Sequence, residues 1–183
     1  MSKKTLDSYN TVLGKNAFKE SITAIENVAV GENALQKNTV GNGNVAVGKN
    51  ALLNNNTGSC NVSVGKLALN DNYSGNNNVG IGDSALESNV AGDYNVATGI
   101  DALKNNQQSN NTAIGSFALK NNIYGEDNTG VGFFSLTNNI TGSNNTAIGR
   151  SALYSNKDGK YNTAAGNSAL KSNITGNNNV ALG

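Results

Sequence analysis

Apolar and polar residues follow a 17-residue period from residue 10 to the end of the chain. Each period matches N-[VT]-A-[VI]-G-x-x-A-L-x-x-N-x-x-G-x-x, whose positions we number one to seventeen from the first Asn. The repeat that starts at Asn95 is shorter, with 16 residues. Self-similarity of this kind is typical of solenoids. The sequence contains ten repeats and the first five residues of an eleventh, and the first Asn of each occurs at Asn10, Asn27, Asn44, Asn61, Asn78, Asn95, Asn111, Asn128, Asn145, Asn162 and Asn179.

Short strands are predicted at positions two to four. Positions two and four are mostly β-branched or aliphatic, with a small residue between them, as in residues 45–47 and 146–148. This alternation is the period of a strand. If each repeat forms one coil, strands of successive coils pair in parallel about 4.8 Å apart, and ten coils make a rod of about 48 Å. The sequence thus predicts an all-β fold, a parallel β-solenoid (β-roll) of ten 17-residue coils at residues 10–183, after an N-terminal segment at residues 1–9.

Asn and Gly at fixed positions are expected to hold the coils together. Gly at position five suits a corner at which a side chain would clash or the backbone φ is positive. Asn at position twelve and Gly at position fifteen are turn formers that tolerate left-handed geometry. Stacked Asn side chains at positions one and twelve are expected to form ladders along the axis. We expect the ladder at Asn27, Asn44, Asn61, Asn78, Asn95, Asn111, Asn128, Asn145 and Asn162, and the corner at Gly31, Gly48, Gly65, Gly82, Gly99, Gly115, Gly132, Gly149 and Gly166.

The conformation of positions six to eleven follows less directly from the pattern. These segments are rich in Ala, Leu, Lys and Ser, which favours a helical turn. A helix is about 10 Å across, however, whereas parallel coils stack about 4.8 Å apart. We therefore favour a second short extended segment, with a single helical turn per coil as the alternative. The expected core residue is Leu at position nine, at Leu35, Leu52, Leu69, Leu86, Leu103, Leu119, Leu136, Leu153 and Leu170.

Energetics and the strand pattern together favour self-association. Burying a large aliphatic side chain contributes about 1.5–3 kcal/mol, and each coil has about two of them. Ordering the backbone costs about 1–2 kcal/mol per residue, so a single thin coil is barely stable. The small residue at position three, with Val or Thr at position two, suggests that another chain packs on the strand face. We expect a homo-oligomer and favour a trimer.

Composition argues against catalysis and against charged or lipid partners. The 183 residues include 22 Gly but no His, and a single Cys, Cys60. Because His is the commonest general base, its absence leads us to expect neither an enzyme nor a cofactor. The net charge of +1 predicts no nucleic-acid binding. No apolar stretch of about 18 residues occurs, so we expect no membrane insertion. The N-terminus lacks the apolar region of a Sec signal peptide.

A small group of aromatic residues is a possible contact with a partner. Phe117 and Phe134 occupy position seven of consecutive repeats, and Phe133 is next to them at position six. We expect these rings to form an exposed apolar patch. The alternative, which we favour, is an aromatic ladder that only stabilises neighbouring coils.

Carboxylates do not suggest a metal site. Asp83, Glu87, Asp93 and Asp101 lie within about one coil of one another in the sequence. Calcium needs about six oxygen ligands or more. The Gly- and Asp-rich nonapeptide of calcium-binding β-rolls is missing, so we expect no metal.

The repeated NVAVG, NTAIG and NVALG segments resemble the YadA-like head repeats of trimeric autotransporter adhesins, and the NTAIGxxALxxN arrays are similar to shaft segments of phage and large-virus fibre proteins. The resemblance covers residues 10–183. It implies a left-handed roll, trimers, and attachment to a surface. The adhesin repeat is shorter, and the secretion signal, coiled-coil stalk and membrane anchor of autotransporters are not present in this sequence. We therefore expect a fragment or a virion component, at a virion or cell surface.

Three functions follow from these observations. The first is a rigid, trimeric fibre or adhesin module that attaches to a host-surface receptor or glycan. The second is a structural filament whose subunits stack head to tail, because solenoid ends without polar caps leave strand edges unpaired. The third and most distant is ice binding, which regular Thr or Asn ladders could support.

Overall fold

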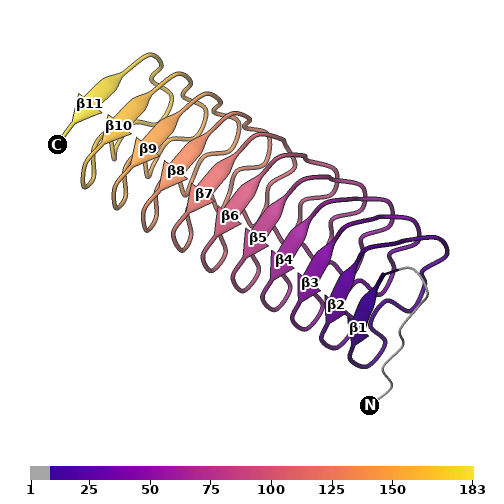
Figure 1. Ribbon diagram of the computed structural model, residues 1–183. Helices are drawn as coiled ribbons and strands as arrows, with labels where there is room; N and C mark the ends of the chain where they lie inside the picture. The colour runs from indigo at the N-terminus through magenta and orange to yellow at the C-terminus, as the bar shows by residue number, and fades with distance from the viewer. Residues whose placement is uncertain (1–8) are drawn as a thin grey trace.

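The computed structural model describes residues 9–183, which form a rod of stacked coils (Figure 1). Each coil contributes one three-residue strand, and all strands lie parallel in a single sheet in chain order. The predicted all-β parallel solenoid is therefore confirmed. Most of the expected N-terminal segment, residues 1–8, lies outside the described residues. The strands are β1 (Thr11–Leu13), β2 (Val28–Val30), β3 (Val45–Val47), β4 (Val62–Val64), β5 (Val79–Ile81), β6 (Val96–Thr98), β7 (Thr112–Ile114), β8 (Thr129–Val131), β9 (Thr146–Ile148), β10 (Thr163–Ala165) and β11 (Val180–Leu182).

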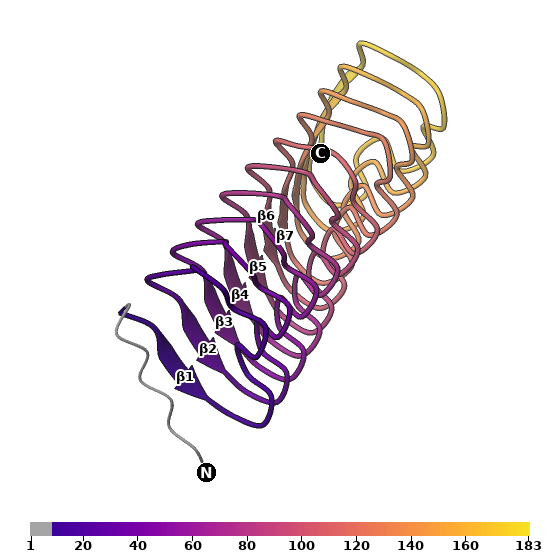
Figure 2. The ribbon, with the colours of Figure 1, turned by 90° about the vertical axis from the view of Figure 1, so that its right-hand side faces the viewer.

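Equivalent positions of successive repeats stack directly on one another. Val45 pairs with Val28 in one neighbouring strand and with Val62 in the other. The 16-residue repeat keeps this register, because its β6 still pairs in step with β7. The turn after Asn106 is one residue shorter than in the other coils. The Asn106 side-chain amide there donates to the Gln108 carbonyl at 2.5 Å. Figure 2 shows the resulting rod with the strands on one side of every coil.

Positions six to eleven form neither a second strand nor a helical turn, so both expectations for this segment are wrong. In most coils the N–H groups at positions eight, ten and twelve donate to carbonyls three residues earlier, as in residues 31–38. Positions seven and nine have positive φ, 58° at Asn33 and 49° at Leu35, as the third residue of a type II turn requires. In most coils the N–H groups at positions seven, nine and eleven donate to neighbouring coils, as from Leu35 to the Ala51 carbonyl at 3.0 Å. Consecutive tight turns thus reverse the chain within the thickness of one coil.

The interior of each coil is filled by small residues and one Leu. In β3 and the turn after it, Ala46, Ala51 and Leu52 are completely buried. Little space separates position three of the strand from the Leu side chain of the preceding coil, because a Cβ added to Gly80 would lie 3.2 Å from Leu69 Cγ. The small third residue is therefore explained by packing within the chain. It does not indicate a partner chain, contrary to the expectation from the sequence.

Two ladders of buried Asn side chains join the coils. At position one, the Asn44 N–H donates to Asn27 Oδ1 at 2.9 Å. At position twelve, the Asn55 side-chain amide donates to Asn38 Oδ1 at 2.6 Å. Within a coil, both kinds of Asn donate to the same carbonyl, since Asn27 and Asn38 each reach the Gly41 oxygen, at 3.1 and 2.8 Å. Such pairing is what allows neutral amides to be buried.

Glycine occupies position five in every repeat and position fifteen in all complete repeats except the first and the sixth, for different reasons. At position five, Gly65 has φ of +137°, and a Cβ there would lie 2.4 Å from the Gly82 carbonyl oxygen of the next coil. At position fifteen, φ lies outside the left-handed region, but a Cβ on Gly41 would lie 2.2 Å from the Gly58 oxygen. Neither position twelve nor position fifteen uses the left-handed geometry that Asn and Gly tolerate. Positive φ at residues other than glycine occurs at positions seven, nine and seventeen.

Candidate functional site: the outer face of the sheet

The outer face of the sheet consists of the side chains at positions two and four. These side chains point away from the coil because the intervening position three points inward, and this central residue is buried in every strand from β1 to β10. Position four is the more exposed, with 37% of Val64, 45% of Ile114 and 49% of Ile148 accessible to solvent. Position two is half-buried in most strands. The most regular apolar positions of the sequence therefore lie on the surface of the single chain.

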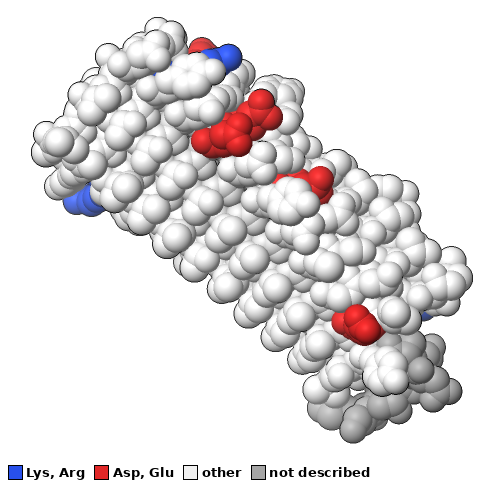
Figure 3. All heavy atoms as spheres, turned by 45° about the horizontal axis from the view of Figure 1, so that its top comes forward, with Lys and Arg blue, Asp and Glu red and all other residues white. Residues whose placement is uncertain are grey.

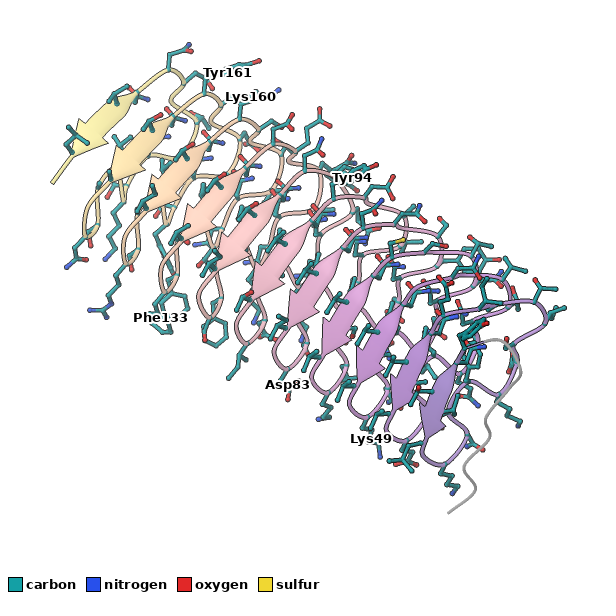
Figure 4. All side chains as sticks on the ribbon, in the orientation of Figure 1. Lys49, Asp83, Tyr94, Phe133, Lys160 and Tyr161 are labelled. Atoms are coloured by element: carbon teal, nitrogen blue, oxygen red, sulfur yellow. The ribbon has the colours of Figure 1, made fainter. Side chains whose placement is uncertain are left out.

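No residue of the eleven described strands carries a charge. Charged side chains occupy the turns on either side instead. Lys49, Asp83 and Phe133 lie along one edge of the strands, and Tyr94 and Tyr161 lie along the opposite edge (Figure 4). On the side of the rod that Figure 3 presents, charged atoms are few and scattered. The sheet face is thus an uncharged apolar stripe between two polar edges.

The stripe is long and narrow, and it changes character halfway along. Eleven strands make it about 48 Å long, and three residues make it about 10 Å wide. Position two is Val in β2 to β6 and Thr in β7 to β10, whereas position four remains aliphatic in most strands. The face therefore has a largely aliphatic half, interrupted by Thr98 in β6, and a half in which a Thr column accompanies an aliphatic column.

One edge of the stripe carries a small ion-pair network on the turns of coils five to seven. Lys104 lies 3.2 Å from Glu87 and 3.4 Å from Asp101, and Lys120 donates to Asp101 at 2.8 Å. Partial burial alone would raise the pKa of Asp101, but the two lysines lower that pKa below its usual value of 3.8. Burial alone would likewise lower the pKa of Lys104, but the carboxylates of Glu87 and Asp101 raise it above 10.5. The network ties three consecutive coils together at their turns.

The three phenylalanines lie on the same edge and contact one another. Phe117 and Phe134 stack with ring centroids 5.1 Å apart, and the Phe133 centroid is 4.0 Å from that of Phe134. Tyr154 approaches Phe134 edge-on at 6.0 Å, and the Lys120 ammonium lies 5.1 Å from the Phe117 centroid. The stacked rings are half-buried, and Phe133 is 41% exposed. These contacts describe an aromatic ladder with one exposed ring, and contact with a partner stays a prediction.

The other candidate features within residues 9–183 are metal ligands, membrane-spanning helices and the cysteine. This part of the chain holds no group of three or more His, Cys, Asp or Glu side chains that could bind a metal ion. It also holds no helix long and apolar enough to cross a membrane. Cys60 is exposed and is not in a disulfide.

The ladder, corner and core residues predicted from the sequence serve the interior, and the outward direction of positions two and four was not predicted. The ladder Asn, the corner Gly and the position-nine Leu residues stack coil on coil; the Leu residues from Leu35 to Leu153 are completely buried, and Leu170 is partly buried. The signal for the stripe was present, since charge is absent from positions two and four in all repeats. Periodicity alone does not tell which side of a three-residue strand faces inward.

No protein-family model, curated protein or solved structure matches this chain. The function is therefore argued from the geometry of the solenoid and its sheet face alone.

Proposed function

We propose that this chain is a structural module that associates with copies of itself through the outer face of its sheet and forms a trimeric fibre segment for attachment at a virion or cell surface. The observation that carries the proposal is the uncharged, half-exposed aliphatic stripe on β1 to β11. Exposed apolar patches of this extent mark interaction surfaces in soluble proteins.

The energy available from covering the stripe is of the right order for association. Full burial of an aliphatic side chain contributes about 1.5–3 kcal/mol, so covering a half-exposed one contributes on the order of 1 kcal/mol. Eleven strands repeat this contribution. The cost of bringing chains together is on the order of 10 kcal/mol, so the total is comparable with that cost. No buried charge has to be desolvated in the process.

The narrowness of the stripe favours three chains over two. Its projected area, about 48 Å by about 10 Å, is roughly 500 Å². A stable interface buries about 800 Å² per partner, so two chains joined by the stripe alone would fall short. Three rods around a common axis give every chain two neighbours, and the flanking turns then add to each contact.

The change from Val to Thr at position two favours parallel chains in register. In that arrangement Thr129 meets Thr129 of the other chains, and Val45 meets Val45. An antiparallel arrangement would place the Thr half against the Val half, where a buried hydroxyl loses hydrogen bonds with water and gains none from its neighbour. A rotation axis parallel to the rod is therefore the favoured symmetry.

The fibre role is supported by the shape of the molecule. The rod grows by one uniform step per coil, and its Asn ladders, Gly corners and Leu core are the same in every complete coil after the first, where Phe18 and Ser21 replace Leu and Asn. The turns at positions ten to seventeen vary from coil to coil and stay on the outside of such a trimer. A rigid spacer with variable outer turns is suited to holding an attachment surface away from its base.

A charge placed on the stripe tests this proposal. Replacing Ile81 and Ile114 together with Lys would put two charges on each chain in the interface, and we expect the assembly to dissociate into single chains. The matched control is Thr57→Lys, an exposed turn residue away from the stripe, which should leave the assembly intact. Light scattering measures the mass, and far-UV circular dichroism verifies that all variants keep their strands. An unchanged mass in the double variant would contradict the proposal.

A further inference from the structure

A trough runs along the rod where the side chains at positions eleven and thirteen flank the inward-pointing Asn of position twelve. Over coils six to ten it forms a groove of about 510 Å³. A second groove of about 450 Å³ lies at the same two positions over coils one to four, between Glu20 and Tyr73. Neither groove includes a residue of the sheet face, so both remain open when that face is covered. The main groove is lined chiefly by Asn105, Asn121, Ile123, Asn138, Ile140 and Ile174.

The two walls of the main groove differ in chemistry. One wall is a column of amides, in which Asn105 donates to Asn121 at 3.3 Å and Asn121 donates to Asn138 at 3.4 Å. These bonds are longer than those of the buried ladder beside them, where Asn139 donates to Asn122 at 2.7 Å. An amide has two N–H donors and two acceptor lone pairs, so each of these side chains retains capacity for another partner.

The opposite wall carries three isoleucines, from coils seven, eight and ten. Ile123 and Ile140 are half-buried and Ile174 is 52% exposed, so each presents aliphatic surface to the groove. The other side chain of this wall is Lys157, which is the one charged residue that lines the main groove. The groove therefore fits a ligand that is uncharged, polar along one side and apolar along the other.

The floor of the groove does not offer a strand edge to a peptide. Its backbone groups already bond from coil to coil, with the Tyr124 N–H donating to the Ile140 carbonyl at 2.8 Å and the Asn121 N–H donating to Thr137 at 3.1 Å. A peptide that binds as an added strand needs free backbone donors and acceptors. The recognition groups here are side-chain amides spaced by one coil, about 4.8 Å.

We infer that this trough binds a neutral polysaccharide chain that lies parallel to the rod axis. Sugar hydroxyls both donate and accept, which matches the amide wall, and the C–H face of a pyranose ring packs on aliphatic side chains. An extended chain of pyranose units advances by about one unit per coil, so two successive sugars meet equivalent Asn and Ile side chains in coils seven and eight, at Asn121 with Ile123 and Asn138 with Ile140. This inference rests on the proposed role of the fibre in attachment to a surface. It adds to that role the chemical class of the ligand, a neutral polysaccharide.

Calorimetric titration of the full chain with neutral linear oligosaccharides tests the inference. The probes are cello-, malto- and chito-oligosaccharides of two to six units. We expect one series to bind with a dissociation constant below about 1 mM and with affinity that rises up to about five units, since the main groove spans five coils. Absence of binding by all three series, or tighter binding of uronic-acid oligosaccharides or of extended peptides than of every neutral sugar, would overturn the inference.

Two substitutions test whether the oligosaccharide binds in the trough. Ile140→Lys puts a charge in the centre of the groove, and the chain itself carries Lys157 at the same position of the next coil, so the fold should tolerate it. We expect at least a roughly tenfold loss of affinity, because a charge in the groove repels the apolar ring face and is itself desolvated by the sugar. Asn167→Lys adds the same charge at position six, outside the trough, where Lys15, Lys49 and Lys66 occur in other coils. It should bind as the unaltered chain does.

Light scattering on the same samples distinguishes a failure of this inference from a failure of the proposed trimer. Equal affinities of Ile140→Lys and the unaltered chain would overturn the trough as the site and would leave a trimer untouched. If the chain has the mass of a monomer but binds oligosaccharides, and Ile140→Lys abolishes that binding, the proposed trimer is overturned. The trough is then supported as the sugar-binding site.

Discussion

The side-chain oxygen of Asn61 accepts two hydrogen bonds from Asn78 in the next coil, from its N–H at 3.0 Å and from its side-chain amide at 3.2 Å. The Asn61 amide in turn donates to Asn44 at 3.1 Å and to the Gly75 carbonyl at 2.8 Å. One buried side chain thus bonds to three coils. This repeated connection explains why position one is Asn in all eleven repeats.

Removing this amide should destabilise the rod. In Asn61→Ala the Asn78 N–H loses its acceptor inside the protein, and each buried unpaired group costs about 1–3 kcal/mol. We expect the free energy of unfolding to fall by about 3 kcal/mol in urea titrations. The control Asn167→Ala, at an exposed turn position, should change it by less than about 0.5 kcal/mol. Equal effects of the two substitutions would refute a stabilising ladder.

The corner glycines are expected to be the least replaceable residues. In Gly65→Ala the new methyl would lie 2.4 Å from the Gly82 oxygen at a φ of +137°, so adjacent coils would have to separate. We expect a loss of about 3 kcal/mol or more, or failure to fold. At Gly43 the φ is +64° and the nearest atom is Cys60 Sγ at 3.7 Å. Gly43→Asn should therefore fold normally, as Asn77 does at the same position; unfolding of both variants would contradict the account.

The ion pairs around Asp101 should make stability depend on pH in the acid range. The pKa of Asp101 is lowered in the folded chain, so its contribution is present above its ordinary value of 3.8 and is lost as the pH falls through the folded value. Asp101→Asn should be less stable than the unaltered chain at pH 7 by under about 1 kcal/mol, because the pairs are partly exposed. This difference should shrink in urea titrations as the pH falls below 3.8; a constant difference would show that the ion pairs are not its cause.

The aromatic ladder should contribute to the stability of coils seven to nine. Phe134→Ser removes the ring that contacts both Phe117 and Phe133, and a ring pair is worth about 0.5–1.5 kcal/mol beyond its buried area. Ser151 and Ser168 occupy the same position in later coils, so the backbone tolerates the change. We expect thermal and urea unfolding to show a loss of about 2 kcal/mol or more, because both ring pairs and the buried part of the ring are lost. Unaltered stability with a lower oligomer mass would instead identify the rings as a partner contact.

The sequence predicted the strands, their order and the stacking of like residues, because these follow from a repeat with period-two alternation. It did not predict the side of the strand that faces inward. That choice depends on Leu at position nine, whose packing against position three is a contact between coils. Nor did it predict the chain of turns at positions six to eleven, in which Leu35 and its equivalents adopt positive φ. Left-handed geometry is unfavourable for Leu, and it is held here by complete burial of the side chain.

We propose that the uncharged sheet face joins copies of this chain around a common axis. The most direct test is the native molar mass of the unaltered chain, measured by light scattering over a range of concentrations. The account predicts a constant mass of about 56 kDa, three times the 18.8 kDa of one chain. A constant mass of 18.8 kDa would contradict it, and so would a mass that climbs without limit, which would indicate end-to-end stacking instead.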